Sequence, residues 1–128
     1  MIKASIVFIL ILLFQCDDQP ILQADLLSRE WTHSYEEQQN NEDEYQLFRP
    51  ADFKNFPASR FRKKFIFKED GSCSALKLAP NDAHYFEKCH WELKSSTLEL
   101  NFPNGTERFK ILMLDESLLS LQLIASTR

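Results

Sequence analysis

Two short stretches of the chain combine residue types that could carry out chemistry. In the first, Asp82-Ala83-His84 places a carboxylate two residues from an imidazole, a spacing that could serve acid–base catalysis or metal binding. No serine or cysteine nucleophile motif accompanies this pair, and His33 and His90 do not stand at a ligand spacing. We therefore predict no catalytic residue, no metal site and no cofactor, and we expect Asp82 to hydrogen-bond nearby backbone amides in a turn.

The second stretch, Ser59-Arg60-Phe61-Arg62-Lys63-Lys64, holds four cations within five residues. In a strand, Lys63 would share a face with Phe61 and Phe65. A cation beside an apolar interior could pair with the carboxylate or phosphate headgroup of a ligand. The alternative, which the residue types favour, is an exposed strand face with Lys63 at the rim and its amine in water.

A run of acidic and amide residues covers positions 36–44. Its carboxylates could attract calcium, but their spacing matches no EF-hand loop. A solvated flexible loop is the favoured interpretation. Arg49, at the end of a predicted strand, could form a salt bridge with this acidic segment.

The first residues have the layout of an export signal. Lys3 is followed by an apolar run over 4–14 that only Ser5 interrupts, and then by Cys16. A bilayer-spanning helix needs roughly 20 apolar residues, and this run is shorter. Leu13-Phe14-Gln15-Cys16 resembles the lipobox of bacterial lipoproteins, although a small residue is usual where Gln15 stands.

The export signal leads to an expected location. A lipid on Cys16 would anchor the protein to a membrane, so we expect an extracytoplasmic protein, either an envelope lipoprotein or a secreted one. Cleavage between 19 and 24 without a lipid, or an uncleaved anchor, are the alternatives. The predicted organisation is a leader over 1–16, a linker over 17–25 and one domain over 26–128.

Composition excludes several classes of function. The formal net charge of −4 argues against nucleic-acid binding, which needs a strongly basic face. Two glycines and no glycine-rich motif argue against a nucleotide-binding loop. Eleven phenylalanines, two tryptophans and three tyrosines suit strands with a packed or ligand-lined interior. We expect a monomer.

The domain reads as a series of short strands separated by turn signals such as Glu69-Asp70-Gly71 and Pro103-Asn104-Gly105. A single helical turn is expected over Ala24–Glu30. The predicted strands are Trp31–Tyr35, Glu44–Arg49, Arg60–Lys68, Ser72–Leu78, His84–Leu93, Thr97–Phe102, Glu107–Leu114 and Leu118–Ala125.

Apolar residues alternate with polar ones along these strands, which predicts one buried face and one solvated face. The residues predicted to face inward are Phe61, Phe65, Phe67, Leu76, Leu78, Trp91, Leu100, Phe102, Phe109, Ile111 and Met113, with Lys63 and Arg60 at the rim. A meander of eight strands has two unpaired edges, and closure removes them. The predicted fold is therefore an all-β, eight-stranded, up-and-down antiparallel barrel, with a partly open sandwich as the alternative.

Several stretches resemble small secreted or lipid-anchored lipocalin-like proteins of the calycin type. They are Leu26–Trp31, Phe67–Cys73, His90–Leu93 with Thr97–Leu100, and Phe109–Leu114. Lipocalins usually carry a glycine two residues before the tryptophan of the first strand, where this chain has Arg29. The resemblance implies a non-enzymatic barrel that binds a small apolar or amphipathic molecule, with Trp31 closing one end.

The predicted ligand-binding residues, in the barrel interior and at its rim, are Trp31, Arg60, Phe61, Lys63, Phe65, Phe67, Trp91, Phe102, Phe109 and Met113. The alternative function is a surface module with a packed interior that binds a protein or an envelope partner.

Strand parity bears on whether Cys73 and Cys89 form a disulfide. A five-residue loop between the strands Ser72–Leu78 and His84–Leu93 would place the two cysteines opposite each other. If Leu76 and Leu78 face inward, however, that register would turn Trp91 and Leu93 outward. A four-residue loop would keep Trp91 and Leu93 inside and separate the cysteines. Burying both side chains is worth several kcal/mol, about as much as a typical disulfide or more. We therefore predict that the disulfide does not form.

Overall fold

The structure is a computed structural model that describes residues 19–38 and 44–128. The predicted leader, including Cys16, lies outside the described residues. Helix α1 (Gln19–Leu27) is followed by β1 (Glu30–His33), the short 3-10 helix η1 (Tyr35–Glu37) and β2 (Gln46–Pro50). The remaining strands are β3 (Lys64–Phe67), β4 (Ser72–Leu78), β5 (His84–Lys94), β6 (Thr97–Phe102), β7 (Gly105–Leu114) and β8 (Leu119–Ser126).

The eight strands form a closed antiparallel barrel, as predicted from the alternation. From β3 to β8 each strand pairs with the next along the chain. The strands that close the barrel do not pair in chain order. Strand β1 lies between β2 and β3, and β2 pairs with β8. The connection over 51–63 therefore carries the chain past β1, and no strand edge is left unpaired among the described strands.

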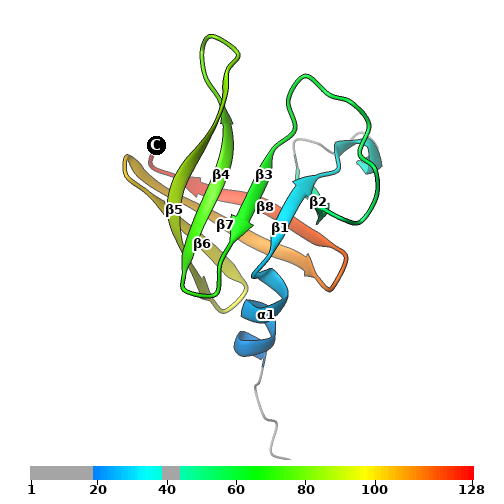
Figure 1. The fold of residues 1–128 in the computed structure, drawn as a ribbon. Helices are drawn as coiled ribbons and strands as arrows, with labels where there is room; N and C mark the ends of the chain where they lie inside the picture. Colours follow the sequence, from blue (N-terminus) through cyan, green and yellow to red (C-terminus); the bar gives the residue numbers. More distant parts are fainter. Residues whose placement is uncertain (1–18, 39–43) are drawn as a thin grey trace, which may run out of the picture.

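Helix α1 lies at one end of the barrel, and the β4–β5 hairpin extends beyond the other end (Figure 1). We call the end opposite α1 the far end. The helix is longer than the single predicted turn and takes in residues assigned to the linker. Its last residue, Leu27, is fully buried, and the Leu27 carbonyl accepts a hydrogen bond of 3.0 Å from Trp31 Nε1. Trp31 thus closes the α1 end.

The core fills the half of the barrel next to α1. Phe65 stacks on Phe67 with ring centroids 5.4 Å apart, and Phe67 meets the edge of Trp91 at 6.0 Å. The fully buried side chains also include Phe48, Leu98, Leu100, Leu119 and Leu121. This half of the interior is a packed core, so any ligand must bind elsewhere.

The inner face of β4 was predicted wrongly. Cys73 and Ala75 are buried and face inward, whereas Leu78 is 41% exposed and Leu76 shares its outer face. The β4–β5 register places Leu78 opposite His84, as for the five-residue loop. In this register, odd-numbered residues of β5 lie opposite odd-numbered residues of β4, and both sets face the interior. Trp91 is therefore only 9% exposed. The error lay in assigning the leucines of β4 to the core.

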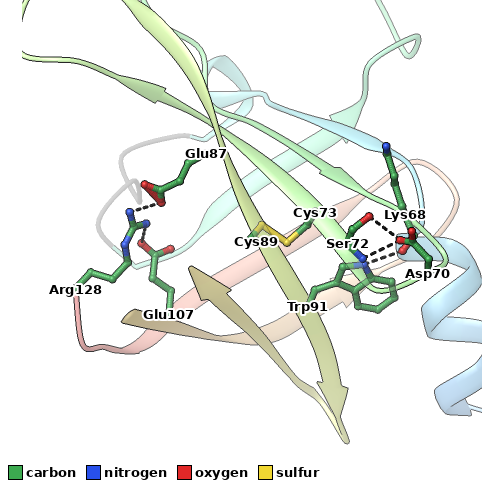
Figure 2. Close-up of a disulfide and its surroundings, with 9 residues drawn as sticks. All are labelled: Lys68, Asp70, Ser72, Cys73, Glu87, Cys89, Trp91, Glu107 and Arg128. Carbon is green, nitrogen blue, oxygen red and sulfur yellow. Dashed lines mark hydrogen bonds and ion pairs between the residues drawn. A yellow bond between two sulfur atoms is a disulfide. The ribbon is translucent and has the colours of Figure 1, made fainter. Parts of the chain in front are cut away.

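The same register brings Cys73 and Cys89 together in a disulfide, which overturns the prediction that none forms. Their Cα atoms are 4.8 Å apart, and both side chains are 4% exposed. Figure 2 shows the bond joining β4 to β5. No conflict exists between the disulfide and a buried Trp91 once Leu76 and Leu78 are outside.

A β-bulge changes the parity of β7. The β7–β8 register shifts between Ile111 and Met113, so Leu114 packs against the core and Met113 is 55% exposed. The predicted inward position of Met113 is therefore wrong. A bulge inserts one unpaired residue and moves the following side chains to the other face of the sheet.

Candidate functional site

Charged side chains gather inside the far end of the barrel. Lys63 precedes β3, Lys77 is near the end of β4, Glu87 is on β5, and Glu107 is near the start of β7. Arg128 lies between the two carboxylates (Figure 2). We call these five residues the charged cluster. Lys77, Glu87 and Glu107 reach this region because each points to the inner face of its strand, and Lys63 and Arg128 lie just beyond the ends of β3 and β8.

Ion pairs connect four members of the charged cluster. Lys77 Nζ is 3.7 Å from Glu107 Oε1, Arg128 Nη1 is 3.2 Å from the same oxygen, and Arg128 Nη2 bonds Glu87. The Arg128 guanidinium lies 4.0 Å above the Phe102 ring, and Lys77 Nζ is 5.1 Å from it. Two carboxylates thus neutralise two cations.

Lys63 is the fifth member, and among the described residues no carboxylate lies within ion-pair distance of it. Its amine is 3.4 Å from Gln46 Oε1, 4.9 Å from the centre of the Phe65 ring and 5.7 Å from that of Phe109. Burial lowers the pKa of Lys63 to about 8, and the positive charge of Lys77 acts in the same direction. The residue is half-buried and its amine lies over the two rings, whereas the favoured interpretation had set it on an exposed strand face with the amine in water.

Apolar side chains border the charged cluster. Phe109 and Phe65 are buried beneath Lys63 and form a floor. Leu123 pairs with Phe109 and so belongs to the inner side, yet it is 56% exposed. Tyr85 pairs with Lys77 and is 47% exposed. The far end therefore combines apolar surface that water can reach with one cation that lacks a carboxylate partner among the described residues.

The remaining predicted site residues divide between core and surface. Trp31, Phe65, Phe67, Phe102, Phe109 and Trp91 are buried, and Met113 is exposed. Arg60 is exposed and donates a hydrogen bond of 2.6 Å to Asp82, while Phe61 meets the edge of His84 at 5.4 Å. Of the predicted residues, Lys63 belongs to the charged cluster, and Phe65, Phe102 and Phe109 lie against it. Sequence reasoning missed Lys77, Glu87, Glu107 and Arg128.

Asp82 and His84 each contact Arg60. The Asp82 carboxylate accepts from the guanidinium, and His84 Nε2 is 3.1 Å from the Arg60 carbonyl oxygen. In the turn itself, the Asn81 side chain accepts from the Ala83 amide at 3.2 Å. Asn81 therefore has the backbone role that was expected of Asp82.

Two acidic residues anchor the connection between β1 and β2. Arg62 donates two hydrogen bonds to Glu36, one of them 2.9 Å long, and Arg49 donates two of 3.0 Å to Glu37. These bonds lower the pKa of Glu36 to about 2 and the pKa of Glu37 to about 2. The first two carboxylates of the acidic segment are thus held in ion pairs, although both residues remain exposed to solvent, and the predicted salt bridge of Arg49 is confirmed.

Other cavities lie outside the barrel interior. One of about 560 Å³ is at the α1 end; its lining comprises Ala24, Glu69, Asp70, Gly71, Trp91, Glu92, Leu93 and Lys94. Within the described residues, no three His, Cys, Asp or Glu side chains gather closely enough to hold a metal ion. The described part of the chain also contains no helix long and apolar enough to cross a bilayer.

A solved lipocalin-like protein from Bacteroides uniformis is similar to this chain. The TM-score is 0.45 and the sequence identity is 18%, and the match covers 77% of this chain and 96% of that one. No family model and no curated protein matches the sequence. The assignment of a closed eight-stranded barrel rests on the strand pairing itself.

Proposed function

We propose that this barrel binds a small amphipathic anion at its far end, without catalysing a reaction. The observation that carries the proposal is Lys63, a cation set on an aromatic floor and lacking a carboxylate partner among the described residues. Exposed Leu123 and Tyr85 offer apolar surface to a ligand tail. Because the core next to α1 is packed, the ligand would be short.

Electrostatics supports an anionic headgroup. Three cations against two carboxylates leave the charged cluster with one net positive charge. Holding an ammonium group partly away from water costs free energy, and an arriving carboxylate would offset that cost. A ligand carboxylate would also raise the pKa of Lys63 back toward its ordinary value.

Calorimetric titration with hexanoate tests the proposal. We expect saturable binding that Lys63→Met abolishes and Lys64→Met preserves. Lys64 is the matched control, since it neighbours Lys63 in sequence but pairs with Glu30 at 3.8 Å. Equal heats from wild type and Lys63→Met, or no saturable heat at all, would refute it. Native mass measurement of protein from its own host would show whether a lipid or pigment co-purifies.

We also propose that the protein is exported and anchored through a lipid on Cys16, which lies outside the described residues. Support comes from the leader and its lipobox-like stretch. Metabolic labelling with a fatty-acid analogue should mark the wild type and leave Cys16→Ser unlabelled. Equal labelling of both proteins would end this part of the proposal, and a soluble, unlabelled wild type would favour plain cleavage.

A second candidate function is an interaction module that docks a protein or envelope partner on the β4–β5 hairpin. Leu78 is 41% exposed and Phe86 is 52% exposed, and Leu76 pairs with Phe86 on the same outer face. Exposed apolar side chains that cluster can mark a contact surface. Phe86→Ser should then abolish partner capture while leaving hexanoate binding intact. Partner capture that Phe86→Ser does not change would refute this second function.

A further inference from the structure

We propose that the Lys63 amine captures short apolar aldehydes as an imine, which makes the far end a covalent carbonyl-binding site. The inference rests on the proposed ligand site, because the same aromatic floor and exposed Leu123 would hold the aldehyde tail. It goes further because Lys63 would react as a nucleophile, whereas the proposed function uses only its positive charge.

The geometry separates Lys63 from the other described lysines near it. Lys77 is held by Glu107, and Lys64 by Glu30 on the outer side of the barrel. Within the described part of the chain, Lys63 Nζ has one polar contact, the weak one of 3.4 Å to Gln46, and it also lies near the rings of Phe65 and Phe109. An amine that is not held in an ion pair is free to move toward a carbonyl carbon.

The surroundings also favour the nucleophilic form of the amine. Desolvation disfavours the ammonium ion, and the cations Lys77 and Arg128 repel it, while Glu107 opposes them. A larger fraction of neutral amine near neutral pH is what activates a lysine toward carbonyl compounds. Hydrated surface lysines remain almost entirely protonated under the same conditions.

The step balances without a further reagent. The neutral Nζ attacks the aldehyde carbon and forms the C–N bond, while the carbonyl electron pair moves to oxygen and takes a proton. The resulting carbinolamine loses its hydroxyl group as water, and Nζ releases a proton as the C=N bond forms. The reverse reaction with water regenerates the aldehyde, so capture is reversible.

Reductive trapping tests the inference on the full chain. The protein is incubated with limiting hexanal and cyanoborohydride, and peptide mass spectrometry locates the adduct. We expect labelling of Lys63 to be at least about 10-fold faster than labelling of Lys64, because burial lowers the pKa of Lys63 to about 8 and its amine is set on the aromatic floor that would hold the aldehyde tail. Adducts distributed over the surface lysines, with no preference for Lys63, would overturn the inference.

Hexanoate titration of the wild type distinguishes this inference from the proposed function, because anion binding needs only the positive charge of Lys63, whereas trapping needs its neutral amine. Lys63→Arg keeps the positive charge but forms no imine under these conditions. In this variant, the preferential hexanal trapping at the far end should disappear, leaving only the slow labelling of surface lysines. Hexanoate binding by wild type without an adduct at Lys63 would refute the covalent step and leave the proposed function standing. Failure of both would refute the site as a whole.

Discussion

The disulfide between Cys73 and Cys89 should contribute a large share of the stability of the barrel. The two residues are 16 apart in sequence, and closing a loop of that length in the unfolded chain lowers its entropy by an amount worth about 3 kcal/mol. For a domain of this size such a change corresponds to a fall in Tm of roughly 12–20 °C. Both cysteines are buried, so reduction would also leave two thiols inside the wall of the barrel.

Urea unfolding of one protein in its oxidised and reduced forms measures this contribution. The Cys16→Ser background leaves only the two barrel cysteines, and reduction keeps every sulfur atom in place, so the comparison isolates the cross-link. We expect a lower midpoint and a larger m-value after reduction, because the reduced unfolded chain exposes more surface. Cys73→Ala/Cys89→Ala should fall at least as far as reduced protein.

Two results would refute the reasoning about the disulfide. One is an equal midpoint for the oxidised and reduced forms. The other is two free thiols per molecule when oxidised protein is titrated in denaturant, which would mean that the bond does not form. A lower midpoint with an unchanged m-value would show that the cost comes from native packing instead of chain entropy.

Three further predictions concern acid stability, strand parity and the buried amine. The pKa of Glu36 is lowered from 4.5 to about 2 in the folded protein, so its contribution to the free energy of unfolding is complete above pH 4.5 and is lost as pH falls toward 2. In urea unfolding, Glu36→Gln should reduce the dependence of stability on pH in this range. Phe109→Ala should cost about 3–5 kcal/mol, whereas Met113→Lys should change stability by less than about 0.5 kcal/mol, and equal losses in urea unfolding would contradict the bulge. Lys63 has a pKa lowered from 10.5 to about 8, so stability should rise as pH increases from 8 to 10.5, and Lys63→Met should raise the urea midpoint at pH 7 and remove that rise.

The barrel could be predicted because its strands carry their own signals. The alternation of Phe65 and Phe67 with polar neighbours, and the turn residues around Gly71, define strands without knowledge of what they pair with. Gly71 has a φ of +89°, which suits a turn between β3 and β4. The predicted and observed bounds of β4 and β6 agree, although the turn signal before β6, Ser95-Ser96, is weak.

The strand register could not be predicted from the sequence. Apolar content suggested that Leu76 and Leu78 face inward, but pairing with β5 places Cys73, Ala75 and Lys77 there. A shift of one residue reverses every side chain of a strand, and the local sequence of β4 does not say which of its two faces is buried. The bulge before Met113 likewise moves the side chains that follow it to the other face of β7, and no feature of the sequence indicated it.

The candidate site was likewise decided by the fold. The sequence was enough to predict that Lys63 would share a face with Phe65, since alternate residues of a strand point the same way. It could not determine that Lys77, Glu107 and Arg128, far apart along the chain, would meet beside it and leave its amine without a carboxylate partner among the described residues. Strand periodicity is a local property, whereas the meeting of charges depends on which strands pair and in which register.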